Sequence, residues 1–127
     1  MQVEINSVSV PVLVTPRING VPVTVTQIKT LYSAFYVDPT STPISFWLEY
    51  RDAIGSDAVV TIEYDPSKSS DTLLFFAIPD SLYQSENKYS VLFFWLVQNN
   101  AMPAVTLERI YTEQALVLEV VDLHNTV

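Results

Sequence analysis

The chain of 127 residues contains no cysteine, and it has only two glycines, one histidine and six basic residues. Without cysteine, disulfides, thiolate metal sites and cysteine nucleophiles are excluded. Gly20 and Gly55 stand far apart, so the sequence has no glycine-rich phosphate loop and no dinucleotide fingerprint. No apolar run approaches the roughly 20 residues that a membrane-spanning helix needs. The sequence therefore predicts neither a cofactor nor insertion into a membrane.

Charge is scarce and mostly of one sign. Hydrophobic residues make up 49% of the chain and charged residues 16%, with a formal net charge of −8. Such an acidic chain repels nucleic-acid phosphates and anionic lipid, so neither is expected as a partner. The low charged fraction also predicts that some apolar surface meets another protein chain.

The length fits one domain covering residues 1–127. The first ten residues lack a basic segment followed by an apolar core and a small-residue cleavage site, so no signal peptide is predicted. We expect a protein made in the cytoplasm.

The most informative stretch runs from Leu73 to Val97. Two apolar runs, Leu73–Ile78 and Val91–Val97, predict buried strands. Pro79 cannot donate to a sheet ladder, so it should end the first strand, and Pro79–Tyr83 suits one short helical turn. The second strand begins near Tyr89, which we expect to bond back to upstream backbone, as the corner tyrosine of Ig-like sandwiches does.

Further strand signals recur along the whole chain. Asn19-Gly20 is the strongest hairpin signal. The predicted extended segments are 2–14, 21–28, 31–37, 44–51, 59–64, 105–111 and 115–121, with residues 112–114 as a bulge or a change of sheet. This spacing predicts an all-β fold, an antiparallel Ig-like β-sandwich of about 7–9 strands.

Alternation assigns faces to two of these strands. In the segment 44–51, Phe46, Leu48 and Tyr50 should face the core, which places Trp47 on the opposite face with Ser45, Glu49 and Arg51. In the next strand, Val60, Ile62 and Tyr64 are expected to point inward.

Catalytic constellations are weak. His124 stands three residues from the C-terminus, where a general base would not be held rigidly. The acid pairs Glu49/Asp52 and Glu63/Asp65 suit a glycosidase or a calcium site, but solvated carboxylates beside turns are their usual interpretation. Residues 65–68, Asp-Pro-Ser-Lys, are typical of a turn. The sequence predicts no enzyme and no metal site.

Aromatic side chains are stronger candidates. Trp47 could stack on a sugar, could be the buried tryptophan of an Ig-like core, or could anchor a protein interface. Tyr36 is likewise expected on an outward face, with Tyr32 as a weaker third candidate. In 91–97 both faces are apolar, since Phe94 lies opposite Trp95, and a two-layer sandwich covers only one of them. The interface candidates are therefore Tyr32, Tyr36, Trp47, Phe94 and Trp95.

The order of strands, the corner at Ile78–Tyr83, the re-entry at Lys88–Val91 and the finish at Leu107–Val121 resemble Ig-like and fibronectin-like sandwiches. They are similar in particular to the small N-terminal adaptor domains of bacteriophage baseplate and tail-fibre proteins, over about residues 20–121. The resemblance implies a virion protein, and it transfers no functional residue.

Two functions follow as expectations. The first is a non-enzymatic virion subunit, in a tail, baseplate or neck or on a capsid surface, that contacts other virion proteins or further copies of itself. A β-sandwich without a signal peptide or cysteine could leave the cell in this way, because lysis releases assembled particles. The alternative is a carbohydrate-binding or adhesin module that recognises a cell-surface glycan with a Trp/Tyr platform.

Overall fold

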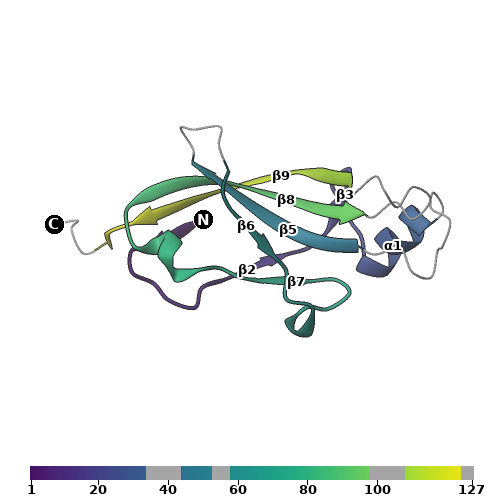
Figure 1. Cartoon of the computed structure of the whole chain (residues 1–127), viewed down its shortest axis with the longest axis horizontal. Helices are drawn as coiled ribbons and strands as arrows, with labels where there is room; N and C mark the ends of the chain where they lie inside the picture. The colour runs from purple at the N-terminus through teal and green to yellow at the C-terminus, as the bar shows by residue number, and fades with distance from the viewer. Residues whose placement is uncertain (34–43, 53–57, 98–107, 124–127) are drawn as a thin grey trace.

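In this computed structural model, residues 1–33, 44–52, 58–97 and 108–123 are described, residues 32–33 and 108–115 by their backbone alone. The elements, shown in Figure 1, are β1 (Gln2–Glu4), β2 (Pro11–Val14), β3 (Arg17–Ile18), β4 (Val21–Pro22), α1 (Val25–Ser33), β5 (Ile44–Asp52), β6 (Ala58–Glu63), η1 (Pro66–Lys68), β7 (Leu74–Ala77), η2 (Asp80–Tyr83), β8 (Asn87–Val97) and β9 (Glu108–Val121).

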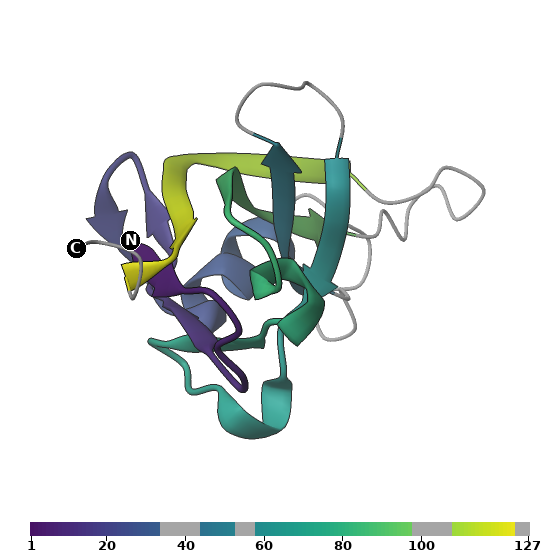
Figure 2. The same cartoon turned by 90° about the vertical axis from the view of Figure 1, so that its left-hand side faces the viewer.

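Five strands form the main sheet, in the order β1-β9-β8-β5-β6. All its neighbours are antiparallel except β1, which runs parallel to β9. A separate antiparallel pair, β2–β7, lies with η1 and η2 on one side of this sheet (Figures 1 and 2). The predicted all-β class is confirmed. The Ig-like sandwich stays a prediction, since the second layer contains only two paired strands.

The hydrophobic core lies between the main sheet and the β2–β7 pair. Alternation along β5 buries Phe46, Leu48 and Tyr50, each at most 2% exposed, as predicted. The ring of Phe46 lies parallel to Phe93, with 6.2 Å between the centroids, and Phe76 meets Phe93 edge-on from β7. Val60 and Ile62 of β6 and Tyr64, the residue after it, pack against the same core, which confirms their inward orientation.

The connection between β7 and β8 follows the prediction closely. β7 ends at Ala77, before Pro79, and one 3₁₀ turn, η2, follows directly after this proline. Near the start of β8, the buried Tyr89 hydroxyl donates a hydrogen bond of 3.1 Å to the Leu82 carbonyl. This bond closes the corner and fixes η2 against the sheet.

The strand predicted over 21–28 is confirmed only in β4, at Val21–Pro22, and is wrong from Val25, where the chain turns into α1. The strand predicted from Leu31 is wrong over the part that α1 occupies, and residues 34–37 lie outside the described residues. A capping box starts the helix: Thr24 Oγ1 accepts from the Gln27 amide at 3.0 Å, and Gln27 Oε1 accepts from the Thr24 amide at 2.8 Å. The pair satisfies two amides that helix geometry leaves without partners.

Asp71 adds a second cap to the same helix end. Its carboxylate accepts hydrogen bonds from the Thr26 hydroxyl and the Thr26 amide, each 2.9 Å long. These bonds, the hydroxyl one first, hold the pKa of Asp71 below its usual value. A negative charge here also complements the positive end of the helix dipole.

The Asn19-Gly20 turn is confirmed. β3 and β4 pair through Ile18 and Val21, and both turn residues have positive φ angles, 50° and 77°. Such angles at both central positions define a type I′ turn, whose twist matches that of the flanking strands.

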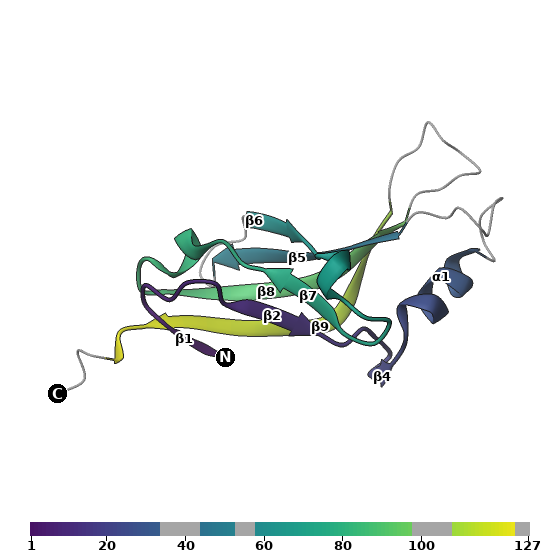
Figure 3. The ribbon, with the colours of Figure 1, turned by 90° about the horizontal axis from the view of Figure 1, so that it is seen from below.

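The predicted extended segment 2–14 is two short strands in different sheets. β1 pairs with β9, and β2 pairs with β7. Between them, Asn6 and Ser9 adopt positive φ angles of 65° and 54°, so the chain turns from one layer to the other (Figure 3).

Near the C-terminus, β9 is one continuous strand of 14 residues. Its pairing with β8 shifts register, because Leu92 pairs with Ala115 and Phe94 already pairs with Tyr111. The extra residues of β9 form a bulge at 112–114, as one of the two predicted alternatives had it.

Candidate interaction surfaces

The first candidate surface is the outer face of the main sheet, the face that points away from β2 and β7. The remaining described elements lie on the opposite side of the sheet or at its end (Figures 1 and 2). Strand register brings to this outer face Ser45, Trp47, Glu49, Arg51, Lys88, Ser90, Leu92, Phe94, Leu96, Val117 and Glu119.

Trp47 lies on this outer face, in register with Phe94 on β8 and with Glu63 on β6. It is half-buried, and its buried indole Nε1 makes no hydrogen bond within the described part of the chain. The interpretation of Trp47 as the core tryptophan is therefore excluded. The tryptophan of the core is Trp95, which packs edge-on against Phe93 and Phe46.

The other interface candidates differ in their positions. Phe94 is 1% exposed and Trp95 is 2% exposed, so neither side chain has appreciable area to offer a partner. Tyr32 belongs to α1, but its side chain is not among those described, and Tyr36 lies outside the described residues.

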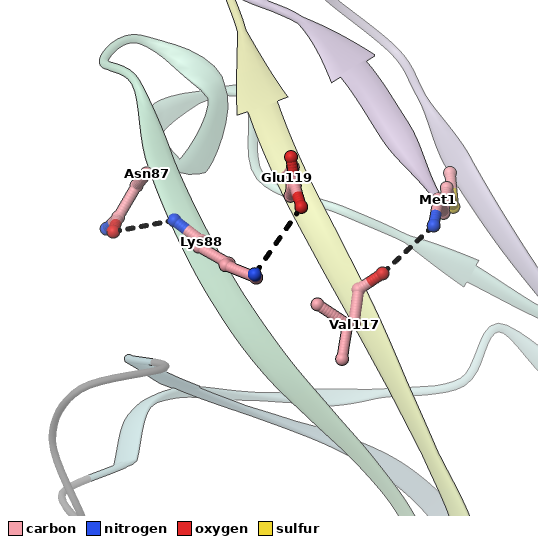
Figure 4. Close-up of polar contacts among 5 residues, drawn as sticks. All are labelled: Met1, Asn87, Lys88, Val117 and Glu119. Carbon is pink, nitrogen blue, oxygen red and sulfur yellow. Dashed lines mark hydrogen bonds and ion pairs between the residues drawn. The ribbon is translucent and has the colours of Figure 1, made fainter.

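The side chains that leave exposed area at the middle of the outer face are mostly apolar. Leu92 and Leu96 of β8 are half-buried, as is Trp47 beside them, and Val117 of β9 is 47% exposed. The N-terminal amino group of Met1 donates a 3.0 Å hydrogen bond to the Val117 carbonyl, beside the parallel pairing of β1 with β9 (Figure 4). The result is a partly apolar surface on a continuous sheet.

Charged groups border this apolar part. Lys88 Nζ lies 3.5 Å from a carboxylate oxygen of Glu119 (Figure 4). Such an exposed pair contributes little to stability, but it keeps the border of the face soluble. At the β6 side, the Ser45 hydroxyl donates a 2.6 Å hydrogen bond to Glu63.

The burial of Glu49 was not predicted. Its carboxyl is 1% exposed and lies 2.5 Å from Nη2 of Arg51, on the same strand face. The sequence had paired Glu49 with Asp52, whose carboxylate instead accepts a hydrogen bond from Asn87 at 3.2 Å. The i, i+2 spacing of Glu49 and Arg51 on a predicted strand was the signal that could have found this ion pair.

The second candidate surface is a groove of about 310 Å³ beside β2, called the β2 groove below. Its wall is formed by residues 12–15 of β2 and the turn after it, and its floor by core-facing residues of the main sheet. The lining residues are Val12, Leu13, Val14, Thr15, Arg17, Leu48, Val91, Phe93 and Leu116.

A third hollow, of about 460 Å³, lies at the outer side of β2 and β7, and its polar groups are already engaged. Lys68 Nζ lies 5.1 Å from the centroid of the Phe75 ring, and Asp80 accepts a 2.8 Å hydrogen bond from the Ser9 amide. These contacts hold the β1–β2 connection and η1 against the sheet, which is a structural role.

The remaining polar candidates do not gather into a site in the described residues. Asp65 caps η1 by accepting from the Ser67 amide at 3.0 Å and the Ser67 hydroxyl at 2.6 Å, which confirms the predicted turn at 65–68. His124 lies outside the described residues. Within the described ranges there is no cluster of three or more metal-ligating side chains, and no helix is both long and apolar enough to cross a membrane.

Comparison with protein-family models, with curated proteins and with solved structures gave no match to this chain.

Proposed function

We propose that this chain is a non-enzymatic structural subunit that joins a larger assembly through protein–protein contacts, and that the assembly is a bacteriophage virion. The observation that supports the assembly role is the outer face of the main sheet. Trp47, Leu92, Leu96 and Val117 leave apolar area there that no described helix or strand covers. Apolar area bordered by charged groups is typical of a protein–protein interface.

The architecture favours assembly over a glycan platform. A sugar-binding tryptophan presents an open ring face and a polar edge to the ligand, whereas Trp47 is half-buried and its indole nitrogen is enclosed. The charged border, with Lys88 and Glu119 both on the surface, can set orientation between subunits at little cost in stability. The virion part of the proposal rests on the resemblance of the sequence, at the corner Ile78–Tyr83 and the re-entry Lys88–Val91, to phage adaptor domains.

The test of assembly is the solution mass by light scattering over a concentration series, with and without candidate partner proteins. We expect self-association or a stable complex, weakened about ten-fold or more by Val117→Lys, which places a charge in the apolar area. The control is Val8→Lys, the same change at a valine that is 69% exposed in the β1–β2 connection. A strict monomer that joins no partner, or equal behaviour of both variants, would contradict the assembly role.

A separate measurement tests the particle. Peptide mass spectrometry of particles purified from a lysate of the source should find the chain at a fixed copy number, as symmetric assemblies require. Absence of the chain from such particles would refute the virion part and leave the assembly part standing. A glycan array that shows saturable binding lost in Trp47→Ala would favour the adhesin alternative instead.

A further inference from the structure

The lining of the β2 groove shows which edge of β2 it borders. β7 pairs with one edge of β2, from Pro11 opposite Ala77 to Val14 opposite Leu74. No residue of β7 lines the groove, whereas Leu116 of β9 does. The groove therefore lies at the other edge of β2, the edge that does not pair with β7.

The core face of the main sheet is open at the floor of this groove. Leu116 pairs with Val91, which is 2% exposed, so both side chains point to the core. Leu118, two residues further along the same face, is fully buried, yet Leu116 is 36% exposed. Cover of the core face therefore ends between Leu118 and Leu116, and Leu13 on the groove wall is 55% exposed.

The open edge of β2 also offers backbone groups. In a β-strand, amides and carbonyls alternate between the two edges, and an edge without a neighbour leaves its row free to pair with another strand. Phe75 points its amide and carbonyl to the outer edge of β7, so its register partner Leu13 points both of its backbone groups to the open edge of β2, whereas those of Val12 and Val14 face β7. No described group bonds to the Leu13 amide or carbonyl there. The groove thus combines an apolar floor with a strand edge ready for pairing.

Arg17 supplies a charge at the same place. Its guanidinium donates a 3.3 Å hydrogen bond to the Gly20 carbonyl, and no described carboxylate lies within 4.0 Å of it. The chain has 14 acidic residues and six basic ones, so an arginine with no acidic neighbour beside a groove is a place for an acidic group from outside.

We propose that the β2 groove receives an extended segment of a partner protein that adds to the free edge of β2 as a third strand of the small sheet. Apolar side chains at every second position of this segment cover Leu116, and an acidic side chain meets Arg17. This inference deepens the proposed assembly function and rests on it. A partner is favoured over a second copy because two copies that each carry a formal charge of −8 repel each other.

The test uses a displayed library of random eight-residue peptides, selected on the full chain. We expect enriched peptides in which apolar residues alternate with polar ones and an Asp or Glu holds a fixed position. With the synthesised consensus peptide, amide signals of residues 12–15 and Leu116 should shift in NMR spectra, and amides of the β2 edge should gain protection from exchange. N-methylation of alternate peptide amides should abolish binding, since the edge then finds no donors.

Charge exchange provides the decisive control. Arg17→Glu should lower the affinity for the acidic consensus peptide at least ten-fold, and this variant should bind the same peptide with Lys in place of its acidic residue. Lys68→Glu, at an exposed site on η1, should leave the affinities for both peptides unchanged. Failure to enrich any peptide, or consensus peptides that bind Arg17→Glu equally well, would overturn the proposal. So would a consensus that copies a segment of this chain, since the occupant would then be a second copy. Because Val117 lies on the opposite face, loss of outer-face assembly and loss of groove binding are separately visible.

Discussion

Removal of the Tyr89 hydroxyl, in Tyr89→Phe, tests whether the corner bond holds the β7–β8 connection. The side chain is 5% exposed, and its hydroxyl donates to the carbonyl of Leu82, which is 7% exposed. The substitution keeps the ring in the core and deletes one buried hydrogen bond. A typical net contribution is about 0.5–1.5 kcal/mol, and a buried carbonyl left without a donor adds to the loss. We expect a destabilisation of about 1.5 kcal/mol.

Tyr83→Phe provides a matched control in the same part of the core. The hydroxyls of Tyr83 and Tyr50 interact with each other but fall outside hydrogen-bond geometry, and neither has a hydrogen-bond partner in the described chain. Burial is the main cause that raises the pKa of both phenols. Removal of a buried hydroxyl that makes no hydrogen bond is close to neutral or stabilising, so we expect a change within about 0.5 kcal/mol of zero.

The assay is urea unfolding followed by tryptophan fluorescence and circular dichroism, with thermal melts alongside. A loss of about 1.5 kcal/mol corresponds to a melting point lower by roughly 4–8 °C for a domain of this size. Tyr89→Phe with wild-type stability, or a Tyr83→Phe variant that loses as much as Tyr89→Phe, would refute the argument that the corner bond, and not ring burial, stabilises this connection.

Three further predictions concern the helix, the hairpin and acid. Thr24→Ala removes half of the capping box and should cost about 1 kcal/mol in urea unfolding, whereas Thr24→Ser should cost little. Gly20→Ala places a side chain at a φ of 77° without any clash and should cost about 1 kcal/mol by the same measurement. Hydrogen bonds from Ser67 and Thr26 lower the pKa values of Asp65 and Asp71. The stability that these two carboxylates add is therefore full above pH 4 and is lost as the pH falls through their folded-state pKa values. Asp71→Asn should make this acid-induced loss of stability smaller in acid titrations followed by circular dichroism.

Local patterns in the sequence were sufficient where one strand faces a core on one side. The alternation in residues 44–51 placed Phe46 inside and Trp47 outside, and the structure has both there. Pro79 and Tyr89 located the corner because each acts through a local constraint. Pro79 has no backbone N–H to donate to the sheet, and the Tyr89 side chain reaches back only as far as Leu82. Asn19-Gly20 located its hairpin for the same reason.

The helix α1 was missed because two local signals compete. Val25, Thr26 and Ile28 are β-branched and favour strands, so the alternation of Val21, Val23 and Val25 predicted extended chain. The capping-box pattern at Thr24 and Gln27 favoured a helix, and Asp71, from a distant segment, strengthens the same helix end. Tertiary contact decided between the two propensities.

The candidate surfaces depended even more on distant contacts. Trp47 could be assigned to a face but not to a degree of burial, because that depends on Phe94 across the strand pair. The β2 groove requires that β2 pair with β7 and lie over β8 and β9, and nothing in residues 11–17 alone specifies this placement. Sequence patterns locate strands; the pairing of distant strands creates the surfaces between them.

The two edges of the small sheet show why the groove lies beside β2 and not beside β7. On the outer edge of β7, Phe75 is bonded twice: its carbonyl accepts from the Asp65 amide at 2.8 Å, and its amide donates to the Ser69 hydroxyl at 2.9 Å. The η1 segment thus closes that edge with the chain's own groups, which is how natural sheets avoid unwanted pairing. Among the described residues nothing covers the open edge of β2 in this way, and the floor beside it exposes Leu116. One protected edge and one open edge over an apolar floor are what strand addition at β2 requires, and this asymmetry is why we place the proposed partner segment there.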